Sequence, residues 1–318
     1  MRAQQPWWRG WRERPRPAGP RVAVVTDSAA ALPARWVEEH DGGVVTVVPM
    51  PVTIGARTYS EGDAGLPAAI SMALAAGEPV STSRPAPGQF SQAFAAAAAA
   101  GFEAIVSIHL SGKLSGTVDA ARLASVDSAV PVIVIDTETV GMAEGFAVQA
   151  AAAAAAIGGG MDAVAQAAAD ASATASVYFY VPSLDQLRRG GRVGAASSWL
   201  GTVLAIKPLL GIRDGQVVPL EKVRTSGKAI ARLQELARAD IAARDGKPVH
   251  VAIHHFGDAG QATDIGRNLR DGCPGIRDVV LTSLPAVLAA HAGLGVLAII
   301  VADAPVAGPA ETGTASLP

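Results

Sequence analysis

A short segment rich in Ser, Gly and Thr carries the side chains best suited to binding an anion. It reads Ser-Gly-Lys-Leu-Ser-Gly-Thr over residues 111–117. The apolar, β-branched run before it at 104–110 is typical of a buried strand, and residues 118–125 are rich in helix formers. Where a strand turns into a helix, the first backbone N–H groups of that helix point outward without partners. Together with the hydroxyl groups of the segment, they predict the head-group end of a binding site.

Polar residues also end other apolar runs in the N-terminal half. Thr26 and Asp27 follow the run 21–25, and Asp136 follows the run 132–135. Because the carboxyl ends of parallel strands share one sheet edge, where ligands of open α/β sheets bind, we expect these side chains near the Ser/Gly-rich segment. Two interpretations of Asp27 stay open: it caps the following helix, or it orients donors near the bound anion.

The order of elements predicts an α/β fold of two domains. Up to about residue 172, strand followed by helix recurs four times, and the strands read as unbroken apolar runs. This favours a parallel sheet with helices on both faces, which we assign to an N-terminal α/β domain at 21–172. Hairpin and crossover connections are mixed afterwards, with a hairpin turn at 213–216. Residues 173–304 are therefore predicted to form a smaller mixed-sheet α/β domain.

Composition narrows the class of function. The chain has 318 residues, of which 50% are hydrophobic and 4% aromatic, and its net charge is −2. This charge balance gives no electrostatic argument for nucleic acid as a partner. The single cysteine, Cys273, rules out an internal disulfide and suits the reducing cytoplasm. No apolar run reaches the roughly 18 residues expected of a membrane span.

Both ends of the chain differ from the rest. Residues 1–20 mix arginines with tryptophans and prolines, and residues 305–318 are rich in Pro, Ala, Gly and Thr. We expect both to be disordered tails. For the first tail, an arm that contacts a partner or transiently touches a membrane is the alternative, since tryptophan and arginine favour interfaces.

Other motifs suggest competing functions. Ser115 lies in Gly-x-x-Ser-Gly, close to but different from the Gly-x-Ser-x-Gly nucleophile elbow, so a serine hydrolase using Ser115 and His291 is the competing enzyme hypothesis. No Gly-x-x-x-x-Gly-Lys-Ser/Thr pattern occurs, so a nucleotide for phosphoryl transfer would have to come on another protein. His254 and His255 are adjacent on an expected strand and point to opposite faces, which argues against a shared metal.

Several segments together resemble the DegV family, bacterial fatty-acid-binding proteins that include the binding subunit of fatty acid kinase. In order, they are Thr26-Asp27-Ser28, Ser81-Thr82-Ser83-Arg84-Pro85, residues 111–117, residues 187–193, residues 206–210, residues 222–225 and residues 291–295. The resemblance spans Val22 to about Asp303. It implies that a fatty acid carboxylate is held in the cleft between two domains, with the acyl chain running into the protein.

The resemblance assigns roles to individual residues. Thr82 and Ser115 would hydrogen-bond the carboxylate with the Gly116 amide beside them, and His291 would be the head-group histidine. Ser83, Thr26 and Asp27 would support that site.

Two arginines receive roles at the surface. Arg224 looks like the basic residue that faces the kinase subunit and the transferred phosphate. The cluster that contains Arg192 is either a solvated face or a patch that docks a partner.

Some residues depart from the family pattern: Arg84 stands where glutamine is usual, Ala86 where serine is common, and Leu294 where proline is frequent. These differences concern the geometry of the head-group site and the choice of ligand.

The resemblance implies a non-catalytic cytoplasmic subunit that needs no cofactor or metal. It would bind a long-chain fatty acid and present the carboxylate to a separate ATP-dependent kinase subunit, which forms an acyl phosphate. A lipid carrier or sensor without a kinase partner is the alternative, and a serine hydrolase is the second.

Overall fold

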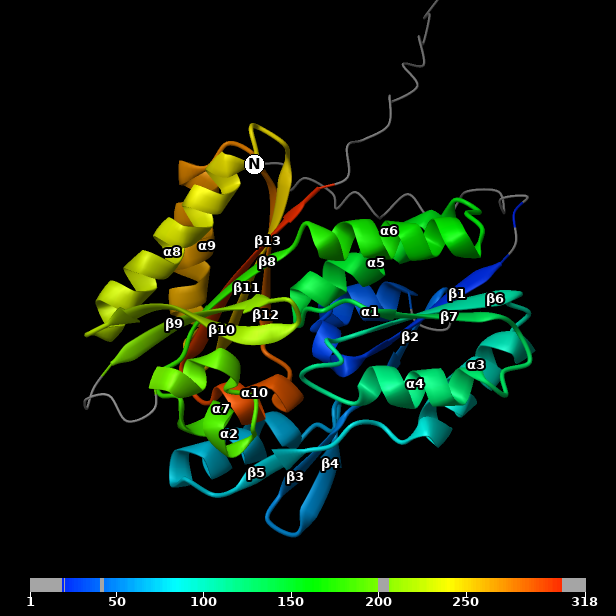
Figure 1. Ribbon diagram of the computed structural model, residues 1–318, viewed down its shortest axis with the longest axis horizontal. Coiled ribbons are helices and arrows are strands. Elements are labelled where there is room, and N and C mark those ends of the chain that lie inside the picture. The colour runs from blue at the N-terminus through cyan, green and yellow to red at the C-terminus, as the bar shows by residue number, and fades with distance from the viewer. Residues whose placement is uncertain (1–18, 20, 41–42, 200–205, 305–318) are drawn as a thin grey trace, which may run out of the picture.

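The computed structural model describes residues 19, 21–40, 43–199 and 206–304, arranged as three sheets with helices around them (Figure 1). The predicted tails at 1–20 (except Gly19) and 305–318 lie outside the described residues. None of the described helices is long and apolar enough to cross a membrane.

A four-stranded parallel sheet forms the N-terminal part. Its order is β2-β1-β6-β7, and every neighbouring pair is parallel. The β-branched runs at β1 and β6 form central strands because every residue in them is buried, which suits a sheet covered on both sides. The strands are β1 (Val22–Asp27), β2 (Val45–Val48), β6 (Ala104–His109) and β7 (Val132–Asp136).

Helices cover both faces of this sheet, as the sequence predicts (Figure 1). On one face lie α3 (Pro87–Ala99) and α4 (Thr117–Ser125). On the other lie α5 (Met142–Ala156), α6 (Met161–Ala173) and the Trp36 side chain of α1 (Ala34–His40). The many alanines of α5 and α6 are helix formers with small side chains, so these helices pack closely on the strands and on each other.

A small antiparallel sheet follows β2 in the chain. It has the order β4-β3-β5 and lies beside α2 (Leu66–Ala76). Its strands are β3 (Pro51–Ile54), β4 (Arg57–Ser60) and β5 (Val80–Thr82). The sequence indicates only a loop at 80–87, and this is wrong for 80–82: β5 exists because Thr82, Ser81 and Val80 pair with β3. Such a short strand has no periodicity of its own.

A six-stranded mixed sheet forms the C-terminal part, in the order β10-β9-β8-β13-β11-β12. Only β11 and β12 pair in parallel; all its other pairs are antiparallel. The predicted hairpin turn is present, and Asp214 and Gly215 both have positive φ, as a type I′ hairpin turn requires. The strands are β8 (Ser176–Tyr180), β9 (Lys207–Arg213), β10 (Gln216–Val223), β11 (Val249–Phe256), β12 (Ile276–Ser283) and β13 (Val296–Asp303).

The two faces of the mixed sheet have different surroundings. Helices α8 (Ser226–Ala243) and α9 (Ala259–Gly272) pack on one face. The other face turns toward the rest of the molecule and shares a hydrophobic cluster with residues of the small sheet, α2, α5, α7 (Asp185–Arg189) and α10 (Ala286–Ala292). This second face is the one that bounds the candidate site.

Candidate functional site

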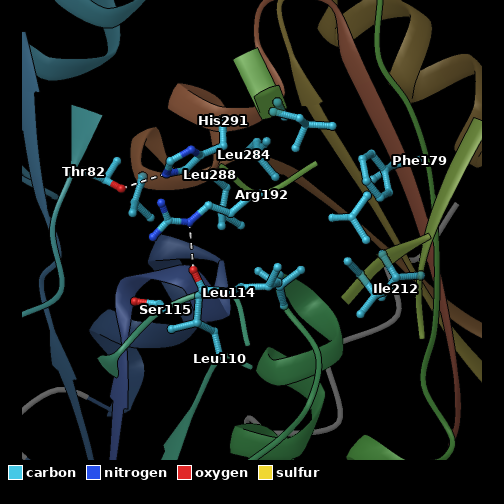
Figure 2. Close-up of a pocket in the computed structure, with 18 of the residues that line it drawn as sticks. Thr82, Leu110, Leu114, Ser115, Phe179, Arg192, Ile212, Leu284, Leu288 and His291 are labelled. Atoms are coloured by element: carbon cyan, nitrogen blue, oxygen red, sulfur yellow. Dashed lines mark hydrogen bonds between the residues drawn. The ribbon is translucent and has the colours of Figure 1, made fainter. Parts of the chain in front are cut away.

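A pocket lies against the inner face of the mixed sheet, where all three sheets approach one another (Figure 2). Its empty space is about 880 Å³, a volume that includes the part open to solvent. Most of its lining side chains are aliphatic or aromatic, and none of the lining residues is acidic. The polar lining residues gather mainly at one end.

Thr82, Ser115, Arg192 and His291 form the polar end and come from separate elements (Figure 2). Thr82 is the last residue of β5, and Ser115 lies in the loop that enters α4. Arg192 follows α7, and His291 is in the last turn of α10. The predicted residues Thr82, Ser83, Ser115, Arg192 and His291 all line the pocket.

A direct contact joins Thr82 and His291. The Oγ1 atom of Thr82 lies 2.8 Å from Nε2 of His291. Burial lowers the pKa of His291 to about 4, and the nearby positive charge of Arg192 adds to this effect. The imidazole is therefore neutral near pH 7. Its Nδ1 atom is buried and has no hydrogen-bond partner among the described residues.

The residue at position 190 leaves room for that imidazole. A Cβ atom on Gly190 would lie 2.1 Å from Nδ1 of His291, closer than real Cβ contacts. Gly190 has φ −78° and ψ −8°, which any residue can adopt. Glycine is required here by the proximity of the ring and not by the backbone.

Side-chain hydrogen bonds hold the Ser/Gly-rich loop in place. The Oγ atom of Ser115 lies 2.8 Å from Oγ1 of Thr117, and Ser111 donates its hydroxyl to the carbonyl of Gly215 at 2.7 Å. The loop is therefore attached to the β9–β10 hairpin. Gly116 immediately precedes α4 and does not itself line the pocket.

Arg192 links the loop to the turn after α7. Its Nε donates to the carbonyl of Leu114 at 2.9 Å, and its Nη1 donates to the carbonyl of Gly190. Neither acceptor is a carboxylate, so its positive charge is not neutralised by these contacts. This places a fixed cation at the polar end.

Apolar side chains form the remainder of the pocket (Figure 2). Leu110 and Leu114 lie on one side, and Leu284 and Leu288 lie on the other. Phe179 and Ile212, together with Val177, Val217, Ala298 and Ile300, extend the lining over the strands of the mixed sheet. The pocket can therefore hold a long apolar group whose polar end stays near Thr82 and Ser115.

His254 also lines the pocket, and nothing in the sequence beyond its place on a strand indicates this. It is buried, and its Nε2 accepts a hydrogen bond from the backbone N–H of Met142 at 3.0 Å. Burial lowers the pKa of His254 to about 4, so this ring is neutral as well. The described residues contain no group of side chains that could hold a metal ion.

Three other predicted residues do not line the pocket. Thr26 is buried and donates its hydroxyl to Oε1 of Glu144 at 3.1 Å. Asp27 accepts from the backbone of Ala29, so it caps a short 3₁₀ helix at Ser28–Ala30 and not the longer helix α1. Arg224 is exposed between β10 and α8.

A chain of Ser, His and Asp does occur, but away from the pocket. Ser107 Oγ lies 2.7 Å from Nε2 of His109, whose Nδ1 lies 2.9 Å from Oδ2 of Asp27. All three residues are fully buried and none lines the pocket. In the described chain no hydrogen bond joins Ser115 to His291, so the contact between nucleophile and base that a serine hydrolase uses is not formed.

Comparison with known sequences gives one consistent family. The model described as "Uncharacterised protein, DegV family COG1307" matches residues 21–304. The DegV domain-containing protein SCO2569 of Streptomyces coelicolor is 46% identical over 282 residues, which are 89% of this chain and 98% of that protein. The DegV domain-containing protein Rv2417c of Mycobacterium tuberculosis is 35% identical over 281 residues, covering 88% and 96%.

Solved structures of DegV proteins share the fold. A fatty-acid-binding DegV family protein of Thermus thermophilus aligns with TM-score 0.82 at 28% identity, covering 89% of this chain and all of that one (100%). DegV of Bacillus subtilis, described as a fatty acid binding protein, aligns with TM-score 0.81 at 29% identity, covering 90% and 100%. These likenesses confirm the predicted α/β architecture.

Proposed function

This chain belongs to the DegV family, and on that premise we propose that it binds a long-chain fatty acid in the pocket and presents the carboxylate to a separate kinase subunit. The observation that carries the proposal is the division of the pocket into an aliphatic part and a polar end without acidic side chains. A fatty acid has the same division. The two structural relatives named above are described as fatty-acid-binding.

The aliphatic part supplies most of the affinity. Burying a tail of about 15 methylenes contributes about 12 kcal/mol before the cost of association is subtracted. Hydrogen bonds from Thr82 and Ser115 contribute about 1–3 kcal/mol together and mainly fix the orientation of the carboxylate. The tail therefore decides how tightly the ligand binds, and the hydroxyl groups decide where its carboxylate lies.

Presentation to a kinase requires little further chemistry from this chain. A fatty acid carboxylate is ionised near neutral pH, so it needs no base before attacking a nucleotide γ-phosphate. Positioning dominates phosphoryl transfer, and a carboxylate oxygen held at the mouth of the pocket is placed for it. We assign Arg224 to the surface that meets the kinase and the transferred phosphate, because it is exposed and outside the pocket.

We propose that the protein works in the cytoplasm, where its single cysteine, which is buried and forms no disulfide, stays reduced. Transient contact with a membrane would let the pocket take up its ligand.

The test separates lipid binding from phosphorylation. Denaturing extraction of the purified protein followed by mass spectrometry should first identify a co-purified fatty acid. Thr82→Ala and Ser115→Ala should then slow acyl phosphate formation with a partner kinase about tenfold or more while weakening fatty acid binding by less, because the tail contacts remain. Arg224→Ala should slow phosphorylation and leave binding intact.

The outcomes distinguish the alternatives. Equal losses of binding and phosphorylation in the Thr82 and Ser115 variants would contradict the division of labour between tail and hydroxyl groups. An unchanged phosphorylation rate in Arg224→Ala would remove Arg224 from the partner surface. Binding without any phosphorylation would favour a carrier or sensor, and ester cleavage by the purified protein alone would favour a hydrolase.

A further inference from the structure

A second guanidinium group lies at the mouth of the pocket. Arg84 lines the pocket and is exposed to solvent. It extends over the Ser/Gly-rich loop, because a Cβ atom on Gly116 would lie 2.8 Å from its Nη1 and 3.2 Å from its Cδ. The absence of a side chain at Gly116 therefore allows the guanidinium to lie against this residue, one position after Ser115.

The two arginines at this end differ in how their donors are used. Arg192 gives Nε and Nη1 to backbone carbonyls and is held in place by them. Arg84 makes no hydrogen bond or ion pair with any described residue, so its guanidinium donors are available to a ligand. With no acidic residue in the lining, both charges act on whatever occupies the polar end.

We propose that Arg84 is a specificity-determining residue: it pairs with the ligand carboxylate at the pocket mouth and makes the site select ionised fatty acids over neutral lipids with the same tail. A guanidinium matches a carboxylate with two parallel hydrogen bonds, which a fatty alcohol or ester cannot reproduce. The inference rests on the proposed binding of a fatty acid, and it names the residue that recognises the negative charge of the head group.

For Arg84 to pair with the carboxylate, the groups that hold the carboxylate must be oriented and must lie within reach of the guanidinium. Thr82 and His291 contact each other directly, and Ser115 contacts Thr117, so these groups are mutually oriented before a ligand arrives. Arg84 is only two residues after Thr82 in the chain, and its guanidinium lies against Gly116, the neighbour of Ser115. A carboxylate held by Thr82 and Ser115 therefore comes within reach of the Arg84 guanidinium.

The experiment compares oleate with oleyl alcohol, which shares the tail and lacks the charge. Both affinities are measured by titration calorimetry for wild-type protein, Arg84→Gln and Arg84→Lys, with folding checked by circular dichroism. Arg84→Gln should weaken oleate binding about tenfold and leave oleyl alcohol binding unchanged, since an exposed ion pair is partly screened. Arg84→Lys should recover part of the loss because it keeps the charge without the planar fork.

A matched control and a second variant complete the design. Arg267→Gln removes an exposed arginine of α9 outside the pocket and should change neither affinity. Gly116→Ala should displace the Arg84 guanidinium and reduce the preference for oleate while keeping the charge.

Each outcome has a distinct meaning. Equal effects of Arg84→Gln on both ligands, or no effect on oleate, would overturn the role of Arg84. Failure of the wild-type protein to bind either ligand would instead overturn the proposed function.

Discussion

The imidazole of His291 shows how one side chain depends on the size of its neighbour. Its Nε2 meets the hydroxyl of Thr82, while its Nδ1 side faces Gly190 at a distance that excludes any Cβ atom. The backbone at position 190 is helical and would accept alanine without strain. A substitution there therefore acts on the ring and leaves the local chain path unchanged.

We expect Gly190→Ala to displace the imidazole, break the contact with Thr82 and weaken fatty acid binding about tenfold. Titration of a fluorescent fatty acid measures the affinity, and the imidazole proton shifts in NMR spectra report on the ring. Gly227→Ala is the control, because a Cβ on that glycine of α8 meets nothing within 4 Å. Unchanged affinity in Gly190→Ala would show that the position of the ring does not matter for binding.

For single residues, the sequence indicated which side chains line the pocket better than it indicated which side chains contact each other. The family pattern named Thr82, Ser115 and His291, and all three line one pocket. The pair Thr82 and His291 is separated by 209 positions, so no local pattern could indicate their contact. The requirement for glycine at 190 was equally hidden, since the neighbour that imposes it lies on another helix.

The seven-residue helix α10 is held at both ends by residues of the small antiparallel sheet region: Glu61, which follows β4, and Thr82 of β5. Its N-terminal N–H groups at Ala286 and Val287 donate to the carboxylate of Glu61, at 3.0 and 3.1 Å. His291, in its last turn, contacts Thr82 of β5. Burial raises the pKa of Glu61, while these two backbone donors act in the opposite direction. The Glu61 carboxylate thus fixes the helix that carries His291.

We expect Glu61→Ala to leave two backbone donors of α10 unpaired, to destabilise the fold by about 1–2 kcal/mol and to weaken fatty acid binding through His291. Hydrogen exchange of the α10 amides should accelerate. Asp63→Ala provides the comparison, because the Asp63 carboxylate accepts from the backbone N–H of Ser60, whereas the α10 donors Ala286 and Val287 bond to Glu61. If the α10 amides exchanged at the wild-type rate in Glu61→Ala, Glu61 would have no positioning role.

Elements with strong local signals were predictable, and the three-residue strand β5 was not. The alternation of apolar strands and helices gave the parallel sheet and its covered faces, because each strand and helix carries its own pattern. The hairpin at Asp214 and Gly215 followed from turn chemistry. The three-residue strand β5 and the role of Glu61 depend on partners distant in the chain, so they appear only in three dimensions.

At the scale of the whole molecule, one ionisable group is fully buried between the parallel sheet and α5. Glu144 of α5 is fully buried, and only Thr26 donates to its carboxylate while Oε2 has no partner among the described residues. Burial, reinforced by the nearby Asp27 and Asp136, raises the pKa of Glu144 well above its ordinary value. The folded protein therefore binds a proton here that the unfolded chain releases at lower pH.

This difference makes stability depend on pH. Because the folded pKa is raised, the stabilising effect is complete below the ordinary glutamate pKa of about 4.5 and is lost as the pH rises through the folded value. Glu144→Gln keeps the acceptor for Thr26 and cannot ionise. We expect its free energy of unfolding in urea to match wild type near pH 4 and to exceed it increasingly as the pH rises above 4.5 toward 8.5. The exposed Glu78→Gln should show no such trend; a constant difference for Glu144→Gln would refute the argument.

The position of β13 has a consequence for the order in which the protein can be assembled in the cell. It is the last described strand along the chain, yet it lies inside the mixed sheet, between β8 and β11. While the ribosome is still elongating the chain, β11 and β12 have no bridge to the earlier strands. The pocket also lacks Val296, Ala298 and Ile300 until then. A nascent chain therefore cannot complete this pocket before translation has passed β13.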